Sequence, residues 1–211
     1  MFITFEGPDG CGKSTILKEV YEVLVDMDIP VIKTREPGGT RISEKLRNII
    51  LDENNKELTD VTESLLMAAS RSQHVEELII PALNEKKIVL CDRFVLSSLV
   101  YQGYARDLGI DEIYELNEFA TLGTKPDMIL FFDVTEDNLL SRRKERNTSD
   151  RLEKEELSFH KKVYKGYNYI KEKYQGDENF YIVDANKDIS EVTSYCISII
   201  LDNYRRKKWN L

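Results

Sequence analysis

The chain has 211 residues and a formal net charge of −8, which argues against a non-specific nucleic-acid-binding protein because that class usually carries a basic face. No apolar run approaches the roughly 20 residues of a membrane span, and the N-terminus lacks the basic-then-apolar layout of a signal peptide. A hydrophobic fraction of 41% is enough for one domain, residues 1–211, with a sizeable core. We therefore expect a cytoplasmic protein with no membrane and no nucleic-acid partner.

Short apolar runs alternate with amphipathic segments along the whole chain, and prolines and glycines mark the loops between them. In chain order the pattern predicts strand 2–6, helix 14–27, strand 30–34, loop 35–40, helix 42–51, helix 58–83, strand 88–91, helix 94–102, loop 103–109, helix 111–121, strand 128–133, helix 154–174, strand 180–183 and helix 188–204. Pro81 is expected to kink or divide the long helix near its end. Short apolar strands separated by helices indicate a five-stranded parallel sheet with helices on both faces, an α/β fold.

Residues 7–14, GPDGCGKS, follow the first strand and match the phosphate-binding pattern G-x-x-x-x-G-K-[ST]. Glycines leave backbone N–H groups free to converge on phosphate oxygens, Lys13 can reach the β- and γ-phosphates, and the Ser14 hydroxyl can ligate Mg²⁺. A glycine-rich turn without a ligand is the alternative. The strand before the loop and the helix after it favour a P-loop NTPase-type fold that binds a nucleoside triphosphate. The expected contacts of ATP in this segment are Gly7, Pro8, Asp9, Gly10, Cys11, Gly12, Lys13, Ser14 and Thr15.

Phosphoryl transfer needs cations around two phosphoryl groups, a metal and exclusion of water. Arginines are abundant between the fourth strand and the next helix, where residues 141–152 are predicted to form a short lid over ATP, although such a run alone could be a solvated face. Asp92 follows an apolar strand, the position of an acid that holds Mg²⁺ together with Ser14; its alternative role is to cap the next helix.

The cysteines and histidines do not have the spacing of a metal site. The cysteines are expected to be reduced thiols. For the histidines, His74 and His160, solvated or capping roles are expected.

Six segments, in the order FEGPDGCGKST, TREPGGT, SRSQH, CDRFVLSSLVYQGYA, KPDMILFFDV and RNTSDRLE, resemble the motifs of the thymidylate kinase family over nearly the whole chain. The resemblance implies a homodimer that phosphorylates dTMP to dTDP with ATP and Mg²⁺, a step in dTTP synthesis. Among P-loop kinases, the pair TREPGGT and DR-x-x-x-S-x-x-x-Q is specific to this family.

The resemblance also implies roles for individual residues. Around dTMP it places Asp9 near the sugar hydroxyl, Tyr101 on the sugar side, Arg71 and Gln102 on thymine, and the remaining contacts at Arg35, Glu36, Arg47, Met67, Arg93 and Ser97. Around ATP it adds Arg142 on adenine, Ala185 at the adenine edge and Arg146 on the transferring phosphoryl group. The implied catalytic set is Lys13, Asp92, Arg93, Arg146 and Asp9, and the implied metal ligands are Ser14 and Asp92.

The chain departs from the family pattern at two places. Many relatives have a basic residue inside the phosphate loop, whereas this chain has Gly10 and Cys11 there, so it resembles the class in which the lid supplies the catalytic arginine. Met67 stands where the family usually stacks an aromatic ring on thymine, and a thioether contacts a ring more loosely.

Two rival functions remain to be weighed. A deoxynucleoside kinase would not need cations at Arg35, Arg47 and Arg93, because a nucleoside is neutral. A nucleotide-dependent switch is disfavoured because residues 186–188, NKD, lack the intervening residue of the guanine-reading N-K-x-D.

Overall fold

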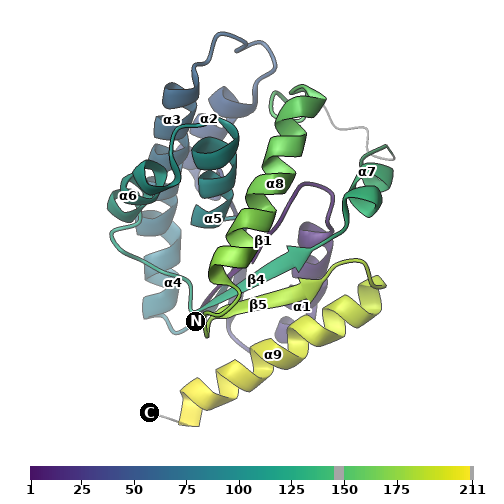
Figure 1. The fold of residues 1–211 in the computed structure, drawn as a ribbon. Coiled ribbons are helices and arrows are strands. Elements are labelled where there is room, and N and C mark those ends of the chain that lie inside the picture. The colour runs from purple at the N-terminus through teal and green to yellow at the C-terminus, as the bar shows by residue number, and fades with distance from the viewer. Residues whose placement is uncertain (145–149, 210–211) are drawn as a thin grey trace.

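A computed structural model describes residues 1–144 and 150–209 of the chain (Figure 1). Five parallel strands form one sheet in the order β2-β3-β1-β4-β5. The strands are β1 (Phe2–Glu6), β2 (Val31–Arg35), β3 (Ile88–Asp92), β4 (Met128–Asp133) and β5 (Phe180–Asp184). The helical elements are α1 (Lys13–Asp26), α2 (Arg41–Leu51), α3 (Asp60–His74), η1 (Val75–Ile79), α4 (Ile80–Asn84), α5 (Val95–Ser98), η2 (Leu99–Ala105), α6 (Ile110–Ala120), α7 (Glu136–Lys144), α8 (Leu157–Tyr174) and α9 (Ile189–Trp209).

Helices cover both faces of the sheet, because the central strands are apolar on both sides of the pleat. On β1, Ile3 and Phe5 pack in a core with α1 and α9, while Phe2 points the other way, toward η1 and α4. On that second face α5, η2 and α8 pack over Ile129 and Phe131 of β4. In Figure 1 α8 and α9 accordingly lie on opposite sides of the sheet, which confirms the predicted α/β architecture.

The carboxyl ends of the central strands bring distant parts of the sequence together. Asp92 at the end of β3 lies in register with Phe5 on one side and with Arg35 on the other. The phosphate loop, the loop after β2 and Arg93 therefore all begin at one edge of the sheet, which is where ligands gather in folds of this class.

Several boundaries differ from the prediction. The long helix predicted over 58–83 is divided into α3, η1 and α4, and Pro81 lies in the first turn of α4, where a missing N–H is tolerated. Helical structure continues through Ala105, so residues 103–105 are not part of a loop. Helix α8 begins at Leu157 rather than at 154, because residues 151–154 form turns. Helix α7 occupies the start of the arginine-rich segment and was not predicted. No helix in the described ranges is long and apolar enough to cross a membrane.

Candidate active site

The loop between β1 and α1 has the geometry of a phosphate cradle. Gly7 and Gly12 have φ values of +146° and +100°, and a Cβ on Gly7 would lie 2.8 Å from the backbone oxygen of Phe132. Lys13 is buried, and its Nζ donates to the carbonyl oxygens of Gly7 at 2.9 Å and Pro8 at 3.0 Å. Because α1 begins at Lys13, free backbone N–H groups and the positive end of the helix dipole face the same point.

A cavity of about 380 Å³ extends from this loop toward α9. Its lining includes Thr15, Arg142 and Ala185, as expected for an ATP site, and Lys187, which the sequence reasoning missed. The Arg142 guanidinium donates to the carbonyl oxygen of Ala185 at 3.0 Å and so joins the start of the lid segment to the loop after β5. Arg146 lies outside the described residues.

Ser14 and Asp92, the two expected metal ligands, are in contact. The Ser14 hydroxyl donates to Asp92 Oδ2 at 2.5 Å. The other oxygen, Oδ1, is buried and has no hydrogen-bond partner within the described part of the chain. One hydroxyl and one carboxylate with an unused oxygen, next to a phosphate loop, are the donors that Mg²⁺ takes beside nucleotide phosphates, so these residues fit the ion.

Arg93 joins the phosphate loop to the second face of the sheet. Its NH2 group lies 2.5 Å from Asp9 Oδ1, and its NH1 group donates to Ser97 Oγ at 2.9 Å and Tyr167 Oη at 2.7 Å. The residue has a left-handed backbone with φ of +70°, a conformation that non-glycine residues keep only where the surroundings enforce it. Tyr101 donates to the other Asp9 oxygen at 2.5 Å, so the carboxylate is held from two sides.

A second cavity, of about 110 Å³, begins at Asp9 and runs between α3 and η2. Apart from Arg35, every residue that the resemblance assigns to dTMP lines it. Arg35 is half-exposed, and its guanidinium donates to Glu44 at 3.0 Å and to the Pro37 carbonyl at 2.8 Å. The sequence reasoning missed six lining residues, and all of them except Leu51 belong to the motifs quoted above: Pro37, Leu51, Ser98, Asp150, Leu152 and Glu153.

The mouth of this cavity brings the guanidinium groups of Arg47 and Arg93 near each other, with Asp9 and Asp150 also in the lining. Burial and the charge of Arg35 lower the pKa of Arg47, and they outweigh the opposing carboxylates of Glu44 and Asp150; the charge of Arg93 adds a weaker lowering effect. The Arg47 guanidinium donates to a neutral acceptor, the Pro37 carbonyl, at 2.8 Å. Crowded guanidinium groups of this kind favour an anion with several oxygens, such as a phosphate.

The inner wall of the cavity is a buried hydrogen-bond network around Arg71. Its Nε donates to Glu36 at 2.6 Å, and its two terminal nitrogens donate to Ser98, Asn117 and the Phe94 carbonyl. Burial alone would raise the pKa of Glu36, but the Arg71 charge and the His74 hydrogen bond outweigh burial and lower it. A guanidinium has five N–H groups, and these bonds use four of them, so within the described residues one N–H of Arg71 remains for a ligand.

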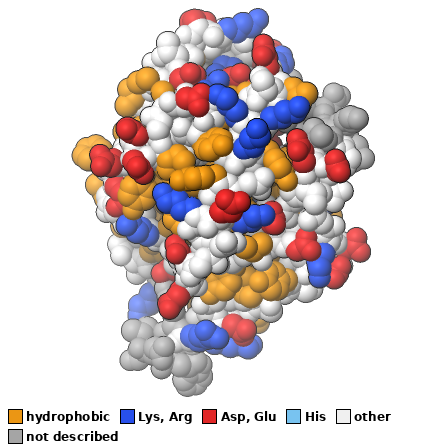
Figure 2. Space-filling model, viewed as in Figure 1, with side chains coloured by type: hydrophobic (Ala, Val, Ile, Leu, Met, Phe, Trp, Pro, Cys, Tyr) orange, Lys and Arg blue, Asp and Glu red, His pale blue; other side chains and the backbone are white. Residues whose placement is uncertain are grey.

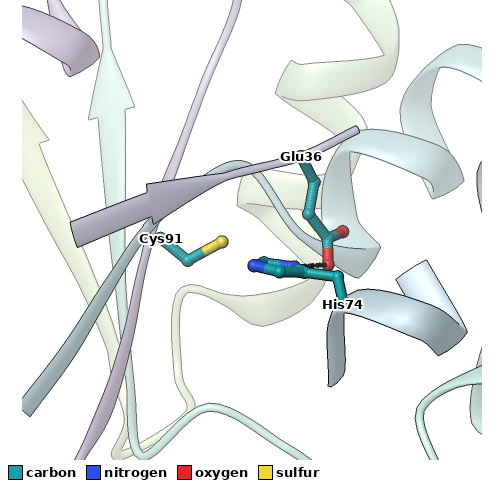
Figure 3. Close-up of side chains that lie close together, drawn as sticks. All are labelled: Glu36, His74 and Cys91. Atoms are coloured by element: carbon teal, nitrogen blue, oxygen red, sulfur yellow. Dashed lines mark hydrogen bonds and ion pairs between the residues drawn. The ribbon is translucent and has the colours of Figure 1, made fainter. Parts of the chain in front are cut away.

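His74 supports this network from behind. The donor atoms of Glu36, His74 and Cys91 lie within 4.8 Å of one another (Figure 3), a spacing that a metal ion could bridge. Each donor already has a protein partner, however: His74 bonds Glu36 at 2.9 Å and Thr34 at 2.7 Å, and the Cys91 thiol donates to the Arg93 carbonyl. We therefore assign His74 a hydrogen-bonding role, and the solvated or capping role expected for it is wrong because its side chain is fully buried. All three cysteines are free thiols, as predicted.

The Asp9 carboxylate gives a test of the site's electrostatics. Burial alone would raise its pKa, but the charges of Arg93 and Lys13 outweigh burial and hold the pKa well below its ordinary value of 3.8. Because the folded-state pKa is depressed, the stabilising contribution is present above the unfolded pKa and is lost as pH falls through the folded pKa. Asp9→Asn should therefore lower the free energy of unfolding at neutral pH, and the difference from wild type should shrink as pH falls below about 4.

Urea unfolding across this pH range measures the effect. Asp26→Asn, at an exposed position on α1, is the matched control and should follow wild type at every pH. A difference for Asp9→Asn that stayed constant into acid would contradict the assigned ion pair.

The chain is similar to known thymidylate kinases over most of its length. A family model described as thymidylate kinase matches residues 5–195. A thymidylate kinase from Finegoldia magna is 55% identical over 200 residues, which cover 95% of this chain and 97% of that protein. One from Bacillus pumilus is 43% identical over 210 residues, 99% of this chain and 98% of the relative. A crystal structure of thymidylate kinase from Ehrlichia chaffeensis has a TM-score of 0.75 and 31% identity, covering 95% of this chain and 98% of that one. The matched region contains all residues that line the two cavities.

Proposed function

Because this chain belongs to the thymidylate kinase family, we propose that it transfers the γ-phosphoryl group of Mg-ATP to dTMP, giving ADP and dTDP as a step in dTTP synthesis. The observation that carries the proposal is the second cavity, which has a cationic mouth at Arg47 and Arg93 and a buried hydrogen-bonding wall at Arg71 and Gln102. A nucleoside monophosphate has two ends that match these features: a dianionic phosphate for the arginines at the mouth and a base for the hydrogen-bonding wall. We propose that residues 1–211 act as one kinase domain. We also propose that the protein is cytoplasmic, as expected from the sequence.

In the proposed reaction a phosphate oxygen of dTMP attacks the γ-phosphorus of ATP in line, and the bond from that phosphorus to the ADP oxygen breaks. Lys13 and Arg93 stabilise charge on the transferring group and on the attacking phosphate. Asp92 and Ser14 would hold Mg²⁺, which neutralises phosphate charge when it is bound. Asp9 lies between the ATP site and the acceptor cavity, because it belongs to the phosphate loop and is bonded to Arg93 and Tyr101 of that cavity.

The lid is proposed to supply the remaining charge. The phosphate loop supplies Lys13 but no arginine, so an arginine for the transferring phosphoryl group would come from elsewhere. Arg142 at the start of the lid segment already reaches the loop, where its NH1 group lies 3.4 Å from the Cys11 carbonyl oxygen. We propose that Arg146, a few residues further along the chain, provides this cation.

A panel of acceptors tests the assignment. ATP consumption coupled to ADP detection should be fastest with dTMP among the deoxynucleoside monophosphates, and thymidine should give no turnover. Thymidine turnover faster than that of dTMP would favour the deoxynucleoside kinase, in which the Arg47 and Arg93 charges would have no phosphate to bind.

We also propose a homodimer through the outer face of α2, α3 and α6. This face carries exposed apolar side chains, and Phe119 is 83% exposed, Leu122 61% and Val61 58%. Helix α3, which carries Val61, packs against both α2 and α6, so the three helices form one layer; Phe119 lies on α6 and Leu122 just after it. Figure 2 shows hydrophobic side chains at its left edge, where Figure 1 places α6. Apolar exposure of this extent is typical of a protein–protein interface.

Phe119→Glu is expected to shift the protein from dimer to monomer in sedimentation-velocity runs, because a buried, unpaired charge at an interface centre is strongly unfavourable. Ile182→Glu introduces the same change at an exposed apolar residue of the edge strand β5 and should leave the dimer intact. A monomeric wild type, or equal dissociation by both variants, would contradict the proposed face.

A further inference from the structure

Glu63 is a fully buried carboxylate behind the wall of the acceptor cavity, and neither the sequence motifs nor the proposed mechanism uses it. It lies on α3, and its Oε1 accepts a hydrogen bond from Gln102 Nε2 at 2.9 Å. Gln102 lines the cavity, whereas Glu63 does not. Within the described ranges, the hydrogen bond to Glu63 is the only one made by the Gln102 amide.

Two arginines fix the Glu63 carboxylate in place. Its Oε2 accepts from Arg106 at 3.1 Å and from Arg151, whose Nε also donates to the Ile50 carbonyl at 2.8 Å. Burial raises the pKa of Glu63, but the hydrogen bonds from Arg151 and Gln102 and the guanidinium charges outweigh burial and lower it. The group is therefore an ionised carboxylate, which can accept hydrogen bonds but cannot donate them.

This chemistry decides which way the Gln102 amide faces. An amide has an N–H₂ end and a carbonyl end, and only the N–H₂ end can bond to an ionised carboxylate. With one N–H of Gln102 donated to Glu63, the amide presents to the cavity its carbonyl oxygen and its second N–H. If the amide turned over, two acceptor oxygens would face each other in a buried site, which is strongly unfavourable.

The fixed orientation has a consequence for the base. Thymine and uracil have a ring N–H that donates and a 4-carbonyl that accepts. Cytosine has the reverse pair, a ring nitrogen that accepts and a 4-amino group that donates. A glutamine that is free to turn could bond to either kind of base. A glutamine held by its N–H₂ end favours the base with a ring N–H, thymine or uracil.

We infer that Glu63 is a positioning residue for base specificity: it fixes the Gln102 amide so that the carbonyl accepts from a ring N–H and 4-aminopyrimidine monophosphates such as dCMP are rejected. The inference rests on the proposed function, because it takes the acceptor to be a pyrimidine monophosphate. Sites that hydrogen-bond a polar group of the substrate reject analogues that leave the site's own groups unpaired.

Glu63→Gln tests this directly. A glutamine at 63 can either donate or accept, so Gln102 becomes free to turn over. The ratio of kcat/KM for dTMP to that for dCMP should fall at least about 10-fold, mainly through a lower KM for dCMP. A general loss of packing would lower both activities and leave the ratio unchanged.

Two variants distinguish the positioning of Gln102 by Glu63 from the contribution of Glu63 to stability. Arg106→Gln weakens the same ion-pair network without touching the Gln102 bond and should lower the melting temperature while leaving the ratio unchanged. Glu63→Asp keeps an acceptor-only carboxylate and should preserve most of the discrimination. A wild-type ratio in Glu63→Gln, or an equal fall in Arg106→Gln, would overturn the inference.

A measurement on wild-type protein covers the case in which the position 63 variants do not fold. A neutron structure of the dTMP complex should show an amide deuteron of Gln102 on Glu63 and the amide carbonyl toward the base, and the reverse orientation would overturn the inference. Failure of the proposed function is distinguishable, because wild type would then not turn over dTMP at all.

Discussion

Lys13→Ala should lower kcat by about 10³-fold while the protein remains folded. The Nζ of Lys13 is buried at the start of α1, and among the described residues it bonds to the Gly7 and Pro8 carbonyls and, at 3.7 Å, to Cys11 Sγ. Within the described residues no carboxylate makes a salt bridge with Lys13, although its charge lowers the pKa of Asp9, which agrees with the proposed role of Lys13 in binding phosphate. Steady-state kinetics at saturating ATP and dTMP measure the loss, and thermal unfolding monitors the fold.

Lys18→Ala is the matched control on the same helix. Lys18 is exposed, and within the described part of the chain its ion pair is an i,i+4 contact with Glu22 at 3.8 Å, so its removal should leave kcat unchanged. A Lys13→Ala enzyme that retained more than about a tenth of wild-type kcat would remove Lys13 from the transition state.

Arg93→Gln should reduce both activity and stability. The side chain bridges Asp9, Ser97 and Tyr167, so its truncation should lower the free energy of unfolding, although by less than the loss of a fully buried pair because the Asp9 side chain is 43% exposed. We expect kcat/KM for dTMP to fall by at least about 10³-fold, since the charge facing the acceptor phosphate is lost. Urea unfolding and initial-rate kinetics measure the two effects separately.

A double-mutant cycle with Asp9→Asn divides the two effects. Once Arg93 is replaced, the Asp9 carboxylate is left without its guanidinium, and Asp9→Asn removes that unpaired charge. The double variant should therefore be more stable than Arg93→Gln alone and remain inactive. If Asp9→Asn restored activity, the role of Arg93 in binding phosphate would be wrong and its contribution would be structural.

The features predicted best from the sequence are those set by contiguous residues. The phosphate loop lies within eight residues between a strand and a helix, and short runs of apolar and β-forming residues identified all five strands. The end of the helix after β3 was predicted too early, because Gly103 reads as a breaker. Gly103 instead packs closely in η2, where a Cβ would lie 3.1 Å from Ile110 Cα. Tertiary contact decided the conformation there.

Features that depend on pairs distant in sequence were missed. Glu63 and Gln102 are 39 residues apart, and His74 and Glu36 are 38 apart, so neither pairing has a local signal. Arg35 was predicted to be one of the arginines of the phosphate site, but its side chain points toward Glu44. The Glu44 carboxylate also accepts a hydrogen bond from the Gly39 N–H at 2.7 Å. A residue type in a motif indicated the chemistry but not the direction in which the side chain points.

The most direct test of the central claim follows the phosphoryl group itself. The wild-type enzyme is mixed with Mg²⁺, ATP labelled in its γ-phosphate, and equal concentrations of dTMP and thymidine. The reaction is quenched after one turnover, and the products are separated. The account predicts that the label appears in dTDP, with none in a monophosphate made from thymidine. Label found in newly made dTMP, or only in free phosphate, would contradict it.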